Sequence, residues 1–464
     1  MDTFNIPQKW DGEADIVVVG AGNAGLPAAI TAREKGASVI VLEAWTAPAS
    51  SLAMIGGGTL FVGTDFQKKE GVDDSVDKCL KEVLELIGGR PEIWKALLER
   101  NVEVYEWLKS LGAKPVGLFH SPGHGERRAH RFEGHGARLL KMLRDAAVEK
   151  GAKILLEHRA EQLIMDAAKG RVIGVRAKNK GKLLNFKAKK AVIITTGGFA
   201  QNKEMVQEYG PHYTACVPAT PPTHWGDGLK MAMAIGSGTY GLGLAVCPST
   251  SVCDVTKNIT IMWNQGGILV NMEGQRWANE LGGKPYGAFM SELLHVHPDG
   301  SHRVIYDDKI RKEASAEDYK RIKEFKADTI EELAKLIDLD PKALAATVKE
   351  YNDDITKNGY DTKFGRKMWG GLHGVDPVPK IDTPPYYGIK AKVSLSSLKG
   401  GIKIDTKGRA LDLFDQVIPG LYAAGEVAGG LQSRTNHYYP SSLTLFAFVF
   451  GRIAAETAAA EAGI

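Results

Sequence analysis

The stretch "DIVVVGAGNAGLPAAITAREKGASVIVLE" at residues 15–43 predicts a strand, a tight turn, a helix and a second strand. The β-branched run from Ile16 to Val19 is typical of a strand that is buried on both faces, and Val39 to Leu42 repeats this composition after an alanine-rich helix. These residues therefore predict a βαβ unit with parallel strands, which is the basis of an α/β fold.

Three glycines in this stretch predict a dinucleotide site. Gly20, Gly22 and Gly25 follow the G-x-G-x-x-G spacing, in which the first makes the turn, the second admits a pyrophosphate and the third lets the helix pack closely on the strand. The pyrophosphate would lie at the helix N-terminus. Glu43, at the end of the second strand, can accept hydrogen bonds from ribose hydroxyls, and its charge argues against the 2′-phosphate of NADP.

Composition sets bounds on the function. A chain of 464 residues exceeds one hydrophobic core, so we expect two domains. A formal charge of +4 without basic blocks argues against nucleic acid. The start of the chain lacks a signal-peptide pattern, and its longest unbroken apolar run is too short for a membrane span. We expect a cytoplasmic protein that binds a small-molecule substrate.

The four cysteines show no metal-site spacing. Cys79, Cys216, Cys247 and Cys253 lack C-x-x-C pairs, and no histidine pairs stand at zinc-site intervals. We expect reduced, structural thiols and no metal.

Further glycine-rich segments favour a large cofactor. They are "KKAVIITTGGFA" (189–200), "THWGDGLKMAMAIGSG" (223–238) and "IPGLYAAGEVAGG" (418–430). With these segments the chain resembles the flavoproteins grouped with fumarate reductase, succinate dehydrogenase and the 3-ketosteroid dehydrogenases, from Asp15 to about Ala459. The resemblance implies a Rossmann-type, glutathione-reductase-like FAD-binding domain, an inserted α+β cap domain, and a FAD-dependent oxidoreductase of CH–CH bonds.

The middle of the chain is expected to form the cap. Between about Val246 and Ile389 the glycine signals thin out and helical patterns dominate, as at residues 329–355, where Thr329 and Asp340 can cap helices. This predicts an FAD-binding domain made of residues 1–245 and 390–464, with a cap domain at 246–389. The substrate would lie between the two, as pockets often lie at domain interfaces.

The resemblance also assigns the cofactor contacts. "SSLAMIGGGTLF" (50–61) resembles the second flavin-contacting loop of the family, and "SSLTLFAFVFGRIAAETAAAEAG" (441–463) predicts a final helix with Ser441 or Ser442 as N-cap, whose positive end would stabilise a reduced flavin. No histidine matches the family's "HSxxAxGG" attachment pattern, so we expect FAD without a covalent link. The expected cofactor-binding residues are Gly20, Gly22, Ala24, Gly25, Glu43, Ala44, Ser51, Gly57, Gly58, Thr196, Gly197, Gly198, Asp227, Gly425, Glu426, Ser442 and Leu443.

The residues with which fumarate reductases handle a dicarboxylate are replaced. In "NELGGKPY" (279–286) Lys284 stands in place of the proton-donating arginine of the family pattern "NExTTRDK". In "SSLKGG" (396–401) Ser396 and Ser397 replace the histidines of "HHTMGG". "HYYPSSLTL" (437–445) lacks the arginine of "NRLGGNAIS".

The same segments resemble the ketosteroid dehydrogenase branch. Pro285-Tyr286 and Tyr439-Pro440 match its motifs. The resemblance implies that a 3-ketosteroid or smaller cyclohexanone-type ketone is desaturated, with Tyr286 taking the α-proton and flavin N5 the β-hydride. Tyr439, helped by the backbone N–H of Ser442 or Leu443, would stabilise the enolate oxygen. Lys284 would lower the pKa of Tyr286, because an ordinary phenol is a poor base.

Other roles and functions stay open at this point. "SPGHGERRAHRFEGHGARLL" (121–140) offers Arg131 for a substrate carboxylate, or it forms a solvated basic loop; Arg434 and Ser397 are further candidates for binding substrate. The alternative function is an ene-reductase of an unsaturated acid or enone, with Lys284 as proton donor. A subunit that acts by association with an iron–sulfur partner is disfavoured by the missing residues. The electron acceptor is unidentified.

Overall fold

The computed structural model describes residues 6–48, 50–54, 58–121, 123–252, 254–258, 265–281, 288–313, 322–369, 376–433 and 438–463. Its main sheet has eight strands and contains the predicted βαβ unit. β1 (Gly12–Val19) pairs in parallel with β2 (Val39–Leu42) and with β9 (Lys182–Ile194), in registers that set Val19 opposite Leu42 and opposite Ile194. The strand order is β19-β20-β9-β1-β2-β6, and β8 and β7 extend the sheet from β9.

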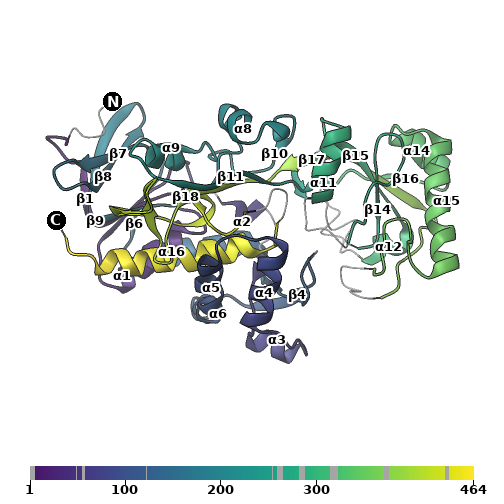
Figure 1. Ribbon diagram of the computed structural model, residues 1–464, viewed down its shortest axis with the longest axis horizontal. Helices are drawn as coiled ribbons and strands as arrows, with labels where there is room; N and C mark the ends of the chain where they lie inside the picture. The colour runs from purple at the N-terminus through teal and green to yellow at the C-terminus, as the bar shows by residue number, and fades with distance from the viewer. Residues whose placement is uncertain are drawn as a thin grey trace.

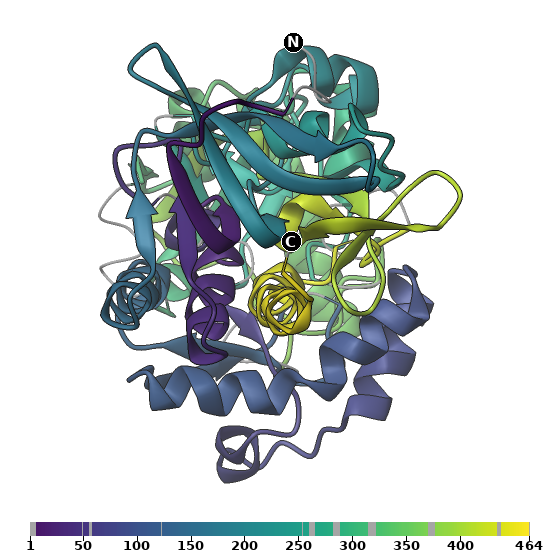
Figure 2. The same ribbon diagram turned by 90° about the vertical axis from the view of Figure 1, so that its left-hand side faces the viewer.

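Helices cover this sheet. α1 (Gly25–Glu34) follows β1, and α16 (Ser442–Ala460) runs beside it (Figure 2). By length and apolar composition α16 could cross a membrane, but 72% of its most apolar window is buried between the sheet and the helices around it, as expected for a core helix. Other elements of this region are β6 (Lys153–Leu155), β7 (Arg159–Asp166), β8 (Arg171–Asn179), β19 (Arg409–Leu411), β20 (Val417–Ala423), α2 (Ser51–Met54), α7 (His135–Glu149), α8 (Lys203–Tyr209), α9 (Asp227–Met233) and the 3₁₀ turns Pro211–Tyr213 and Gly425–Val427.

Two small sheets and four helices complete the first unit. One sheet joins β3 (Thr59–Leu60), β5 (Ala129–Phe132) and β4 (Pro115–Phe119), and the other joins β11 (Thr239–Val246), β18 (Ser397–Lys403) and β21 (Ala428–Gly429). α3 (Asp65–Lys69), α4 (Val76–Leu86), α5 (Pro91–Glu99) and α6 (Asn101–Ser110) lie below α16 in Figure 1.

The second unit is a mixed α and β cap at the right of Figure 1. Its sheet has seven strands in the order β13-β12-β17-β15-β14, with β10 and β16 also pairing with β17. The strands are β10 (Val217–Pro218), β12 (Ser249–Ser251), β13 (Asp254–Asn258), β14 (Ile268–Val270), β15 (Ser301–Asp307), β16 (Phe325–Ala327) and β17 (Tyr386–Leu395), and the helices are α11 (Ala288–Val296), α12 (Asp308–Glu313), α14 (Ile330–Leu336) and α15 (Pro341–Asn358).

The predicted caps of two cap-domain helices are confirmed. The Thr329 hydroxyl accepts the N–H of Glu332 at the start of α14, and the Asp340 carboxylate accepts the N–H of Ala343 at the start of α15. The predicted cap of α16 differs. Ser441 stands at the N-cap position with φ +67°, but its side chain makes no capping bond, and the Ser442 hydroxyl donates to the carbonyl of Tyr439. The first turn of α16 is therefore left without a side-chain acceptor.

A glycine in α16 sets how closely this helix approaches α1. A Cβ on Gly451 would lie 2.4 Å from the carbonyl oxygen of Ala24, which is backbone that cannot swing away. We expect Gly451→Ala to lower the free energy of unfolding by about 1–3 kcal/mol because the two helices must separate. Thermal unfolding measures this. Gly463→Ala is the matched control, since a Cβ there meets nothing within 4 Å. A Gly451→Ala protein as stable as wild type would refute the close contact.

Candidate functional site

A cavity runs from the turn after β1 to the junction with the cap. Its empty volume is about 1830 Å³, a figure that includes space open to solvent. Most of the predicted cofactor contacts meet on its walls. They are Gly20, Gly22, Ala24, Glu43, Ala44, Ser51, Gly58, Thr196, Gly197, Asp227, Gly425, Glu426 and Leu443, together with the predicted substrate contact Ser397.

The turn after β1 has the geometry of an anion site. Gly20 has φ +107°, and a Cβ there would lie 2.6 Å from the carbonyl oxygen of Thr195. Gly25 packs against the same turn, since its Cβ would lie 1.9 Å from the Gly20 carbonyl oxygen. α1 has no side-chain N-cap and no acidic residue in its first turn, so nothing of its own neutralises the helix dipole there. The residues therefore fit a pyrophosphate at this helix end.

Glu43 occupies the position expected for a ribose acceptor. Its carboxylate accepts the N–H of Ala21 and the N–H of Trp45, each at 2.9 Å, and the residue is buried. Burial raises the pKa of Glu43, and these backbone N–H groups act in the opposite direction. The two N–H bonds fix the carboxylate at the end of β2, where it faces the cavity.

A second acidic group lies in the middle of the cavity. Glu426 accepts the Ser397 hydroxyl at 2.6 Å, and its other oxygen lies 3.8 Å from Nδ1 of His224. Burial lowers the pKa of His224, so this imidazole is neutral at pH 7. The sequence reasoning missed His224, although it lies in the quoted Gly-Asp-Gly segment. Gly197 and Gly198 admit these side chains, because a Cβ at either position would come within 2.6 Å of His224 or Glu426.

Asp227 is held by an arginine that the sequence reasoning also missed. The Arg159 guanidinium donates to both carboxylate oxygens of Asp227, at 2.7 and 2.9 Å, and lies 4.2 Å from the ring centre of Trp225. Arg159 and Asp227 both line the cavity.

The end of the cavity nearest the cap is lined largely by apolar, aromatic and hydroxyl side chains among the described residues. Val246 and Pro248 flank it where β11 leads to the cap sheet, and β18 sets Ser397 opposite Val246. Phe119 and Tyr438 contribute aromatic surface. Among the described residues that line this end, none carries a positive charge.

Tyr439 does not reach the cavity. Its hydroxyl donates to Glu82 at 2.6 Å and lies 2.5 Å from Nη1 of Arg128, and its ring stacks on His124 with centres 4.1 Å apart. Burial raises the pKa of the Tyr439 phenol. Tyr439 is 1% exposed and is not among the cavity-lining residues, so its predicted place beside a substrate oxygen lacks the geometry that it needs. The neighbouring residue Tyr438 lines the cavity instead.

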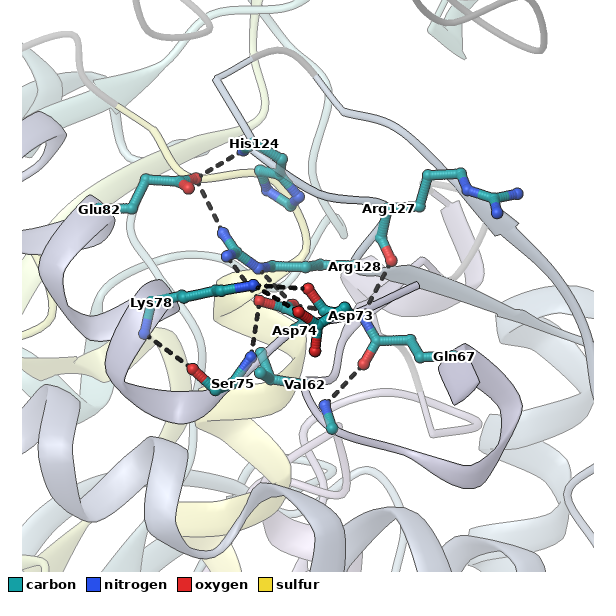
Figure 3. Close-up of polar contacts among 12 residues, drawn as sticks. Val62, Gln67, Asp73, Asp74, Ser75, Lys78, Glu82, His124, Arg127 and Arg128 are labelled. Atoms are coloured by element: carbon teal, nitrogen blue, oxygen red, sulfur yellow. Dashed lines mark hydrogen bonds and ion pairs between the residues drawn. The ribbon is translucent and has the colours of Figure 1, made fainter. Parts of the chain in front are cut away.

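Arg128 is the centre of this buried network (Figure 3). Its guanidinium forms two hydrogen bonds with Asp74, at 2.7 and 2.9 Å, and one with Glu82 at 2.8 Å. The arginine and Asp74 are both buried. The basic segment at residues 121–140 is therefore not simply a solvated loop. It includes β5, and the charge of Arg128 is neutralised by the carboxylates of Asp74 and Glu82, which lie just before and within α4.

The remaining predicted site residues either lie away from the cavity walls or fall outside the described residues. Gly25, Gly198 and Ser442 are described but do not line the cavity. Arg131 points its guanidinium over the ring of Phe119, 5.3 Å from its centre, and does not line the cavity itself. Gly57, Lys284, Tyr286 and Arg434 lie outside the described residues, as does Cys253. The other three cysteines are free and buried.

Known proteins resemble this chain over nearly its whole length. The sequence pattern of the FAD binding domain matches residues 15–441. "Fumarate reductase (cytochrome)" of Shewanella frigidimarina is 31% identical over 96% of this chain and 77% of its own length. The vinyl phenol reductase of Lactiplantibacillus plantarum is 28% identical over 94% of each chain. The crystal structure of a 3-ketosteroid-Δ4-(5α)-dehydrogenase from Rhodococcus jostii RHA1 is similar with a TM-score of 0.77 and 27% identity, over 98% of each chain.

The Glu43 carboxylate provides a test of the cofactor site. Glutamine has one carbonyl oxygen and an NH₂ group, so Glu43→Gln leaves one of the two backbone N–H groups without its charged acceptor. A hydrogen bond to a charged group contributes about 1.5–3 kcal/mol, so the site would be destabilised by about that free energy. We expect FAD to bind roughly tenfold more weakly or worse. Fluorescence titration of the apoprotein with FAD measures this affinity. Glu13→Gln, which alters an exposed ion pair with Lys189, is the control. Equal affinities in the two variants would contradict the assignment.

Proposed function

The chain belongs to the FAD binding domain family of fumarate reductase-like flavoproteins and is a FAD-dependent CH–CH oxidoreductase, and from this premise we propose that it desaturates a cyclic ketone. The substrate would be a 3-ketosteroid or a smaller cyclohexanone-type compound, oxidised at its α and β carbons. FAD would be held without a covalent link, by the β1–α1 turn, Glu43 and the N-terminus of α16.

The lack of a positively charged side chain among the described residues at the cap-side end of the cavity carries this proposal. A dicarboxylate that binds in a cavity loses the hydration of two negative charges. A binding site usually compensates this desolvation free energy with positively charged side chains. Phe119, Val246, Pro248 and Tyr438 supply apolar and aromatic surface, whereas the hydroxyls of Ser396 and Ser397 already donate to the Val246 carbonyl and to Glu426. These groups fit a neutral ring with one carbonyl oxygen. They give a carboxylate no charged partner among the described residues of this wall.

The bound FAD would supply the two-electron step, taking the β-hydride at N5 and passing the electrons to an acceptor that is not identified. The chain supplies the proton acceptor and the polar groups at the carbonyl. We assign the α-proton to Tyr286, with Lys284 lowering the pKa of its phenol. Both belong to the segment at residues 282–287, outside the described residues.

Glu280, two residues before this segment, is held in place by ion pairs within the cap. This residue is buried, accepts two hydrogen bonds from Arg276 at 2.9 and 2.8 Å, and pairs with Arg366 at 3.3 Å. Burial works against the charge of Glu280, but these arginines lower the pKa of its carboxyl below the usual value. Glu280 is therefore a buried, charged carboxylate that two arginines hold in the interior of the cap.

A second candidate function is the reverse reaction. The similarity to proteins named fumarate reductase and vinyl phenol reductase favours an ene-reductase of an unsaturated acid or an enone. In that direction Tyr286 or Lys284 would donate the proton.

Anaerobic absorbance of the bound flavin separates the two candidates. We expect a saturated cyclic ketone to bleach the oxidised flavin band within the time of turnover. Chemically reduced enzyme mixed with an unsaturated acid should be reoxidised no faster than reduced enzyme in buffer without the acid. Rapid reoxidation by the acid, with no bleaching by any cyclic ketone, would instead favour the ene-reductase.

Replacing the proposed base tests the assignment of Tyr286. Tyr286→Phe removes the hydroxyl and keeps the ring, so we expect turnover to fall at least 100-fold, within the range that general base catalysis contributes. Bound FAD should remain at the wild-type level. Tyr360→Phe, on a partly exposed cap tyrosine near Lys367, is the control. Near-full turnover in Tyr286→Phe would remove this residue from the mechanism.

A further inference from the structure

A buried lysine lies behind the cap-side wall of the cavity. Lys399 belongs to β18 and is 4% exposed. Its Nζ donates to Oε1 of Gln432 at 2.5 Å and lies 3.8 Å from the centre of the Tyr438 ring. This places the Lys399 amino group directly against the face of an aromatic residue that lines the cavity.

The Tyr438 oxygen lies among groups that favour negative charge. It accepts the backbone N–H of Ser441 at 3.1 Å, at the N-cap of α16. The first turn of α16 has no acidic residue, and its dipole directs positive potential toward this end. The Lys399 Nζ lies over the face of the same ring and adds positive charge when it is protonated. A hydroxyl in these surroundings is a stronger hydrogen-bond donor than an ordinary phenol.

The charge of Lys399 is not balanced by an ion pair in the described part of the chain. Glu426 acts on it through space, while the Glu426 carboxylate itself accepts the Ser397 hydroxyl. The other titratable groups that face it are Cys247 and Tyr438. Burial lowers the pKa of Lys399 well below its usual value, and Glu426 works in the opposite direction. Negative charge arriving at the cavity would therefore stabilise the protonated lysine.

We propose that Lys399 and Tyr438 form an oxyanion site, in which the Tyr438 hydroxyl donates to the carbonyl oxygen of the substrate and Lys399 stabilises the charge that develops there. This rests on the proposed function for the class of substrate. Tyr438 is the catalytic residue of the pair because it lines the cavity, and Lys399 is a positioning residue that acts through it. Lys399 stands where the quoted fumarate reductase pattern "HHTMGG" has methionine, so that pattern does not contain this charge.

A chromogenic phenol tests the pair without turnover. We would titrate the FAD-loaded enzyme with 4-nitrophenol, whose phenolate absorbs in the visible, and with nitrobenzene, which has no ionisable oxygen. In wild type we expect bound 4-nitrophenol to ionise at least one pH unit below the free compound. In Lys399→Met this shift should disappear and phenolate affinity should fall about tenfold, which equals about 1.4 kcal/mol, with nitrobenzene affinity unchanged. Tyr438→Phe should lose phenolate affinity as well.

Controls separate this role from a structural one. Lys403→Met changes a lysine of the same strand that pairs with Asp415, and it should behave as wild type. FAD content and thermal midpoint are measured for every variant, and Lys399→Gln replaces Lys399→Met if the latter loses FAD. Wild-type phenolate binding in the Lys399 variant, or an equal loss of phenolate and nitrobenzene binding, would overturn the proposal. Lysine-dependent phenolate binding in an enzyme that desaturates no ketone would refute the proposed function alone.

Discussion

The close approach of backbone to backbone around the β1–α1 turn is the constraint on which the site depends. At Gly20, Gly25 and Gly451 a Cβ would lie between 1.9 and 2.6 Å from a carbonyl oxygen of a neighbouring segment. Because these positions lack side chains, α1 can pack on β1 and α16 can pack on α1. Two helix N-termini are thereby brought to one cavity. One is expected to hold the pyrophosphate, and the other lies beside Tyr438 at the cap-side end.

Charge is distributed unevenly along this cavity. Toward the β1–α1 turn lie Glu43 and the Arg159–Asp227 pair. Toward the cap the described walls are largely apolar, aromatic or hydroxylic, with Glu426 bound to the Ser397 hydroxyl. The Lys399 amino group lies over the face of the Tyr438 ring. A cation in that place stabilises an oxygen that becomes negative during reaction more than it stabilises a substrate that is charged from the start. This distribution of charge is therefore consistent with the proposal that the substrate is a neutral carbonyl compound.

Much of the fold could be predicted from the sequence because its signals are local. β-branched runs, the glycine spacing and the Thr329 and Asp340 caps each depend on a few neighbouring residues, and all are present as predicted. Features that depend on distant partners were not predicted. The basic segment around Arg128 gave no sign that Asp74 and Glu82 would neutralise it in the interior. The burial of the Tyr439 hydroxyl away from the cavity was not predicted for a similar reason. Adjacent side chains before a helix point in different directions, and Arg128 and Glu82 bind the Tyr439 hydroxyl away from the cavity.

The most direct test of a neutral carbonyl substrate is the perturbation of the bound flavin spectrum on ligand binding. Oxidised holoenzyme would be titrated in parallel with 2-cyclohexenone and with fumarate, at low and high ionic strength. We expect a saturable spectral shift with the enone, with an affinity that does not depend on salt, and no saturable shift with fumarate. Tight, salt-sensitive binding of fumarate with no response to the enone would contradict it.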